Sequence, residues 1–74
     1  MKPEVSMWVL YERPDDAPDS WVLRRWVIEF GQESPREAFA APDPEPFRQW
    51  MIDEGRTCFP RFQEDDPCIV EVWM

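Results

Sequence analysis

The stretch that decides the fold is SWVLRRWVIEF, residues 20–30. It is rich in β-branched and aromatic residues and free of proline and glycine until Gly31, which predicts the central strand of a sheet. Side chains alternate between the faces of a strand, so one face carries Val22, Arg24, Trp26, Ile28 and Phe30, and the other carries Trp21, Leu23, Arg25, Val27 and Glu29. Because a chain this short can cover only one face with a helix, we expect part of the other to stay open to a partner.

The composition predicts one small folded domain, residues 1–74, with an acidic surface. The chain is 43% apolar and 15% aromatic, above the range of disordered chains despite nine prolines. Sixteen Asp and Glu against eight Lys and Arg, with no histidine, give a formal net charge of -8. Phosphate contacts need clustered cations, so we expect no direct nucleic-acid binding and predict a basic protein surface as the partner.

The sequence contains no long uncharged apolar run, so we expect no signal peptide, no membrane partner and a cytosolic protein. Cys58 and Cys68 could face each other in an antiparallel pair, but a cytosolic setting favours free thiols. Whether they are bonded stays open at this point. A zinc site needs four Cys or His ligands, so we predict no metal and no cofactor.

The first half of the chain predicts two strands, with a third segment that is ambiguous. Residues 6–12 alternate as a strand, with Trp8 and Leu10 on one side and Met7, Val9 and Tyr11 on the other. Residues 13–19 are turn formers that join this strand to the next as a wide hairpin. Residues 34–41 fit either a helix with a capping box or a short edge strand; we favour the strand, which ends at Pro42.

A helix is expected from about Pro44 to Glu54. Asp43 is a suitable N-cap, Pro44 suits the first helical position, and Gly55 supplies a left-handed C-cap. The i, i+3, i+4 spacing of a buried stripe is met by Phe47, Trp50 and Met51. We expect all three side chains in the core, with Phe47 and Trp50 between helix and sheet.

The last part of the chain predicts a weak edge strand, a charged turn and a final strand. Pro60 confines residues 57–62 to a sheet edge, residues 63–67 form the turn, and residues 68–74 are a β-branched strand tied down to its last residue. The assembled prediction is an α+β domain of two layers, an antiparallel sheet of four or five strands with one helix on one face.

The residues show no catalytic constellation, so we expect no enzyme. The serines have no histidine to activate them, and only two glycines are present, so no phosphate-binding loop exists. Neighbouring carboxylates such as Asp15 and Asp16 are expected on a surface turn, which supplies neither the burial nor the pocket that acid and base work needs. The acidic turns also lack the glycine and the spaced glutamate of a calcium loop.

The five tryptophans exceed what a core of this size encloses easily, so some should be only partly buried. Each is either core or an anchor in an interface, where Trp and Arg are enriched. For Arg24 and Arg25 we favour cross-strand pairing with Glu12 or Glu71 over an interface role. The candidate partner-binding residues are Asp15, Asp16, Asp19, Glu64, Asp65, Asp66, Trp21, Trp26 and Arg25.

Three segments, MWVLYERP at 7–14, WVLRRWV at 21–27 and DDPCIVEVW at 65–73, are similar to a group of short acidic proteins of temperate phages and prophages. Residues 32–62 match that pattern only loosely. The group supplies no activity that maps onto single residues. By character, a small acidic phage protein also resembles anti-CRISPR proteins, which bind host effector complexes without catalysis.

The resemblance implies a stoichiometric inhibitor that binds a host CRISPR-Cas effector complex, with type I favoured, in the host bacterial cytoplasm. Its carboxylates would stand where DNA phosphates lie, as a DNA mimic, and its charge would speed the encounter with a basic groove. The alternative is a phage structural or assembly module that forms homo-oligomers through an exposed aromatic face. The chain would accordingly be a monomer or a homodimer.

Overall fold

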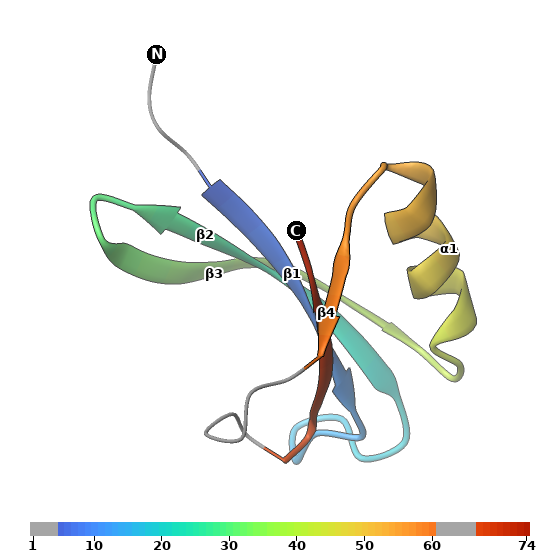
Figure 1. Cartoon of the computed structure of the whole chain (residues 1–74). Coiled ribbons are helices and arrows are strands. Elements are labelled where there is room, and N and C mark those ends of the chain that lie inside the picture. Colours follow the sequence, from blue (N-terminus) through green and yellow to red (C-terminus); the bar gives the residue numbers. More distant parts are fainter. Residues whose placement is uncertain (1–4, 61–66) are drawn as a thin grey trace.

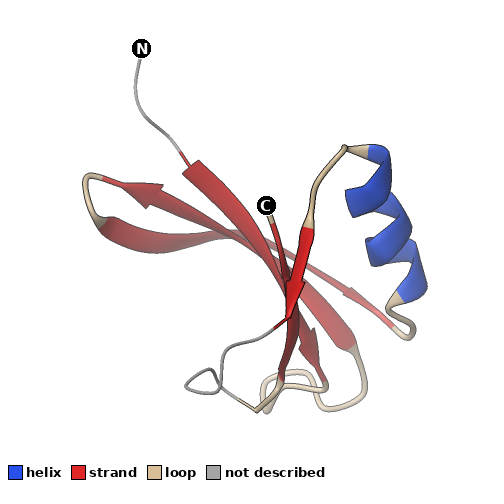
Figure 2. Cartoon of the chain, in the orientation of Figure 1, coloured by secondary structure: helices blue, strands red, loops and turns tan. Residues whose placement is uncertain are grey.

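A five-stranded antiparallel sheet with one helix on one face makes up the computed structural model, which describes residues 5–60 and 67–74 (Figure 1). The strands lie in the order β3-β2-β1-β5-β4. Their bounds are β1 Val5–Glu12, β2 Trp21–Glu29, β3 Gln32–Ala41, β4 Cys58–Pro60 and β5 Ile69–Trp73, and α1 spans Glu45–Asp53. Figure 2 shows the helix as a second layer beside the twisted sheet. The predicted two-layer α+β architecture is confirmed.

The middle strand of the sheet is β1, not β2. Residues 20–30 were expected at the centre, and β2 is indeed paired on both sides, with β1 and β3. However, β5 pairs with the other edge of β1 and carries β4 on its far side. The centre therefore moves one strand along because the C-terminal strand adds next to β1, which no local pattern within residues 20–30 could indicate.

The core lies between α1 and three neighbouring strands. Leu10 on β1 and Leu23 on β2 are opposite each other and fully buried, and Met51 of the helix is fully buried against them. The rest of this cluster is Trp8, Phe47 and Trp73. The buried side chains of β1 and β2 in this cluster belong to the face that alternation predicted, so the period-two pattern of both strands is confirmed.

Residues 34–41 are strand, as favoured, and belong to the edge strand β3. Glu29 pairs with Gln32, so Phe30 and Gly31 form a two-residue turn, with φ of 52° and 76°. Positive φ at both positions is the mark of the hairpin turn that matches strand twist. Pro35 is tolerated because an edge strand has one side without partners.

The helix begins one residue later than expected, and Asp43 does not cap it. Pro44 is the N-cap, and no side chain caps the helix. A capping side chain accepts from the second or third helical N–H, but here the second is Pro46, which has none, and Phe47 already donates to the Pro44 carbonyl at 3.1 Å. Asp43 therefore precedes the N-cap and does not take the capping role.

The helix end agrees with the prediction. Gly55 has φ of 75° and donates to the Ile52 carbonyl at 2.9 Å, while Arg56 donates to the Met51 carbonyl at 3.0 Å. These two bonds form a Schellman motif, which satisfies carbonyls that the helix leaves free.

Trp50 is only partly buried, contrary to the expectation that the whole stripe lies in the core. Its ring lies 4.9 Å from that of Trp8 and 5.3 Å from that of Phe39. Phe39 belongs to the edge strand β3 and is itself exposed, so this aromatic group lies at the rim of the core. Phe47 and Met51 are buried as expected.

The C-terminal strand is tied down to its end, as predicted. Thr57 and Met74 exchange both backbone hydrogen bonds, at 2.8 and 3.0 Å. The edge strand β4 that follows Thr57 is short and ends at Pro60, in agreement with an edge position. Arg61 and Phe62, expected in the same strand, lie outside the described residues.

Met51→Ala should lower the free energy of unfolding by about 2 to 5 kcal/mol, because it leaves a cavity under the helix. Urea unfolding followed by tryptophan fluorescence measures this change. The matched control is Ile52→Ala on the next residue, which is 56% exposed and should change stability by less than about 0.5 kcal/mol. If Met51→Ala does not fold, Met51→Leu should, at a cost below about 1.5 kcal/mol. Equal losses at positions 51 and 52 would contradict the packing of α1 described above.

Candidate functional site

The loop between β1 and β2 holds three exposed carboxylates, those of Asp15, Asp16 and Asp19. Two successive turns shape it, because Ala17 donates to the Pro14 carbonyl at 2.8 Å and Ser20 donates to the Ala17 carbonyl at 3.1 Å. Arg13 and Ser20 close its base with a backbone bond of 3.0 Å. These bonds hold the acidic loop, residues 13–20, in one shape although it is on the surface.

The acidic loop overhangs a small polar hollow of about 290 Å³ at one end of the sheet. Asp16 lies 3.6 Å from Arg24, whose guanidinium also lies over the ring of Tyr11 at 5.7 Å. Asp15 and Asp19 pair with no cation in the described part of the chain. Two of the three predicted carboxylates therefore keep their charge free for a partner, while Arg24 offsets the third.

The second acidic turn, with Glu64, Asp65 and Asp66, lies outside the described residues. Cys68 lies two residues after Asp66 and directly before β5. It lines the same hollow as Asp15 and Asp16. Its carbonyl accepts from the Glu12 N–H at 2.7 Å, which joins the start of the acidic loop to the chain just after residues 61–66.

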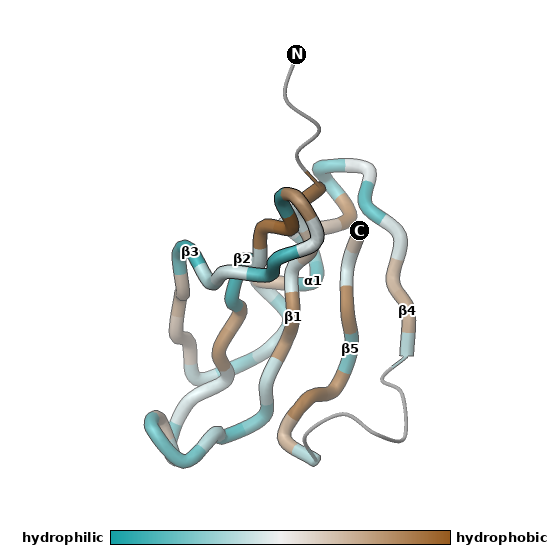
Figure 3. The backbone as a smooth tube through the Cα atoms, turned by 90° about the vertical axis from the view of Figure 1, so that its left-hand side faces the viewer, coloured by the Kyte–Doolittle hydropathy of each residue, from teal (hydrophilic) through white to brown (hydrophobic). Residues whose placement is uncertain are grey.

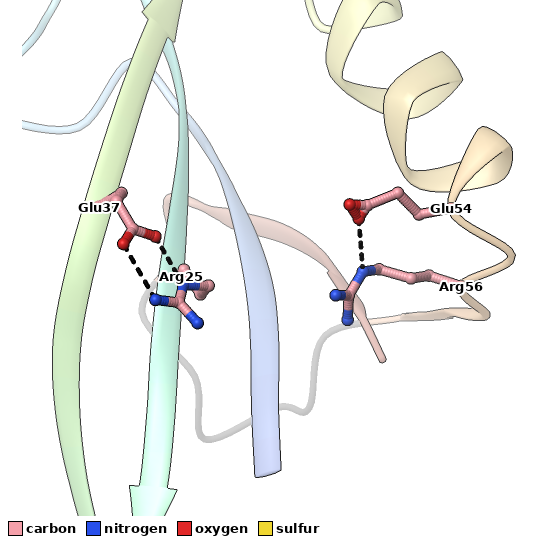
Figure 4. Close-up of polar contacts among 4 residues, drawn as sticks. All are labelled: Arg25, Glu37, Glu54 and Arg56. Atoms are coloured by element: carbon pink, nitrogen blue, oxygen red, sulfur yellow. Dashed lines mark hydrogen bonds and ion pairs between the residues drawn. The ribbon is translucent and has the colours of Figure 1, made fainter. Parts of the chain in front are cut away.

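We expected Arg25 to pair with Glu12 or Glu71. It pairs instead with Glu37 on the neighbouring strand β3 (Figure 4). Its Nε and Nη2 donate to the two carboxylate oxygens at 2.6 and 2.9 Å, and these bonds hold the pKa of Glu37 below its usual value. The sheet register explains the error, because Glu12 lies opposite Trp21 and Glu71 lies on β5, which does not touch β2. Arg25 is thus committed within the fold.

Glu71 instead binds the helix. Arg48 of α1 donates to it at 2.7 Å and also pairs with Glu45 at 2.9 Å, and the hydrogen bond to Glu71 is the main reason that the pKa of Arg48 is raised. The Cys58 thiol lies 3.2 Å from the other Glu71 oxygen. Desolvation of the sulfur, and then the hydrogen bond to this carboxylate, raise the pKa of Cys58 to about 11. No disulfide joins Cys58 and Cys68, as favoured.

Trp21 and Trp26 lie on opposite faces of the sheet and cannot serve one interface. Trp21 packs, partly buried, against the core under the helix. Trp26 lies on the uncovered face, where its indole N–H donates to the Tyr11 hydroxyl at 3.2 Å. Of the two predicted anchors, only Trp26 is placed on a face that a partner could reach.

The uncovered face of the sheet contains an apolar hollow of about 430 Å³. Brown segments of β1, β2 and β5 in Figure 3 mark how apolar these strands are. The hollow is lined by Met7, Val9, Tyr11, Trp26, Ile28, Glu33, Ile69, Val72 and Met74. The strand patterns indicated which residues share this face. Val72 and Met74 line the hollow only because β5 pairs with β1.

Phe30 is a residue that sequence reasoning placed within the strand and that the structure places in the hairpin turn. Its side chain is 83% exposed. A φ of 52° is uncommon for an aromatic residue, and the preferred residues here are Asn, Asp or Gly. The signal available in the sequence was the Phe-Gly pair between two strand patterns.

Other kinds of site receive no support from the described residues. Residues 5–60 and 67–74 contain no group of three or more His, Cys, Asp or Glu side chains that could hold a metal ion. Within the same ranges, no helix has the length and apolar character needed to cross a bilayer. The helix described there, α1, has nine residues, three of which are charged.

The chain matches no protein-family model, no curated protein sequence and no solved structure. The similarity to short phage proteins therefore stays a prediction from the sequence.

Alkylation of Cys58 by iodoacetamide should be slow at pH 8 and accelerate only as the pH approaches about 11, because the thiolate is the reactive form. Peptide mass spectrometry in a Cys68→Ser background measures the rate at each pH. Glu71→Gln removes the carboxylate that disfavours the thiolate, so the profile should move to lower pH. Glu45→Gln is the control, since Glu45 binds Arg48 but not the thiol. An unchanged profile in Glu71→Gln would contradict this role.

Proposed function

We propose that this protein is a stoichiometric inhibitor without catalytic activity, which binds a basic surface of a larger protein complex through the acidic loop. The observation that carries the proposal is the set of exposed carboxylates at Asp15, Asp16 and Asp19 on a loop shaped by its own backbone bonds. The specific target proposed is the DNA-recognition surface of a host CRISPR-Cas effector, with type I favoured. The net charge of -8 and the similarity to phage proteins support that choice.

The construction of the acidic loop suits charge capture. An ordered loop loses little conformational freedom on binding, so more of the interaction energy appears as affinity. Exposed carboxylates also keep their hydration until contact, and a field of one sign speeds the encounter with a surface of the other sign. The loop thus offers a basic surface negative charges on a backbone that is already ordered.

Three of the described arginines are paired with carboxylates outside this loop. Arg25 is held by Glu37, Arg48 by Glu45 and Glu71, and Arg56 by Glu54 at 3.5 Å. These three arginines bind carboxylates of β3, of β5, of α1 and of the residue after α1. Asp15 and Asp19 accordingly form no ion pair within residues 5–60 and 67–74.

Reversing Asp15, Asp16 and Asp19 to lysine should abolish inhibition of a type I effector while leaving the fold intact, since exposed charges contribute little to stability. The three reversals change the net charge by +6, from -8 to -2. Pull-down from a host that expresses the effector, together with a DNA-binding assay, measures the loss. Wild-type binding should also weaken steeply with salt, because the Debye length falls to about 3 Å at 1 M.

A matched control carries the same charge change at the helix, with lysine in place of Asp43, Asp53 and Glu54. It should keep inhibition, because none of these three residues belongs to the acidic loop or lines the hollow beside it. A third variant, with lysine at Glu64, Asp65 and Asp66, tests the other acidic turn. Full inhibition by both the 15/16/19 and the 64/65/66 variants, with no effect of salt, would refute charge mimicry.

A further inference from the structure

The uncovered sheet face is apolar at its centre and carries one charge of each sign at its margins. Cross-strand neighbours form rows across β2 and β3, and the row of Trp26 and Pro35 lies in the middle. Arg24 lies two residues before this row on β2. Two residues after it lies Ile28, paired with Glu33 on β3. Arg24 and Glu33 are therefore placed at matching offsets on either side of Trp26.

We propose that this face binds a second copy of the same chain in a two-fold symmetric dimer, sheet against sheet. An axis that lies between the two sheets and crosses the strands at the Trp26 row reverses the direction along each strand. A residue two positions before the row then meets one two positions after it. Each strand then lies over its own counterpart, so Arg24 of each copy lies over the second copy's Ile28, one strand away from Glu33. The offset between neighbouring strands is about 5 Å, which two long side chains can bridge, and the apolar hollows meet between these two ion pairs.

Arg24 can take part although it already lies 3.6 Å from Asp16. Its side chain is 31% exposed, and a guanidinium has five N–H donors. Glu33 is exposed and lines the hollow, and no ion pair joins it to another described residue. The dimer therefore gives a partner to a carboxylate that has none and a second partner to an arginine that has room for it.

The same axis explains Phe30. Phe30 lies four residues after Trp26. The axis therefore places it over the row four residues before Trp26 in the second copy, where Val22 pairs with Tyr11. In the single chain, Phe30 combines an aromatic side chain that is 83% exposed with a positive φ, and both are unfavourable. Backbone strain of this kind persists where function requires it. Contact with the second copy would remove its side chain from water.

Association of two copies through their sheet edges is disfavoured, so the apolar sheet face is the surface through which they would associate. The edge strand β3 contains Pro35 with Arg36 and Glu37 beside it, and the other edge strand, β4, has three residues and ends in a proline. Proline, charge and shortness are the features that block edge-to-edge pairing. The occupant of the face is thus a second sheet face, and the complementary charges select a copy of this chain.

Light scattering of the purified protein after gel filtration should give twice the 8.9 kDa of one chain. Arg24→Glu and Glu33→Arg should each weaken the dimer on the order of tenfold, because two symmetric pairs change from attraction to repulsion. An equimolar mixture of these two variants should recover the dimer, since each introduced charge then meets its opposite. Asp53→Arg on the helix is the control and should dimerise as wild type does.

Phe30→Asn separates a binding role from a structural one. Asparagine suits the positive φ, so the folded chain should melt at the same or a higher temperature, whereas the dimer should dissociate at higher protein concentration than wild type. A single-copy mass for the wild type at the highest soluble concentration would overturn the proposal. So would a mixture of the two charge variants that associates no better than either alone. Neither result depends on an effector complex, so both are independent of the inhibition tests.

Discussion

The pairing of β1 with β2 is the constraint on which the rest of the structure depends. The two strands keep one register without a break from Val5 opposite Ile28 to Glu12 opposite Trp21. This register places Leu10 opposite Leu23, both inaccessible to solvent, under the helix. A shift of one residue would turn the buried set of either strand to the other face, so the apolar pattern and the pairing specify each other.

That register also leaves apolar side chains on the second face of the sheet, over which the described residues place no covering layer. Val9, Val22 and Val72 are nevertheless buried, because larger neighbours cover them. Among these neighbours are Trp26 and Tyr11, joined by a hydrogen bond. A chain of 74 residues has one helix to offer, so this face is shielded by its own side chains around a hollow. The molecule thus has a closed side and an adaptable side, and the latter contains two methionines, which accommodate irregular partners well.

Ion pairs neutralise the acidic charge in some regions of the surface and leave it unpaired in others. Arg25 and Arg48 each form short pairs that join separate elements, β2 to β3 and α1 to β5. On an exposed surface such pairs add little stability, but they fix where the remaining negative charge stands. The acidic loop keeps most of its charge because the register directs these arginines elsewhere. The polar hollow beside the acidic loop and the apolar hollow both have Tyr11 in their lining, so the two surfaces adjoin at this residue.

Local patterns by themselves determined the strands, their two faces, the acidic loop and the end of α1 at Gly55, because alternation and turn chemistry are read within a few residues. The same patterns misplaced Phe30, the burial of Trp50 and the N-cap role of Asp43, where neighbours or prolines change what a residue can do. Only the tertiary structure decided that β5 lies beside β1, that Arg25 meets Glu37, and that a hollow forms on the open face. These features depend on which strands become neighbours. Strand pairing joins residues that are far apart in the chain, and the local sequence of one strand does not indicate its partner.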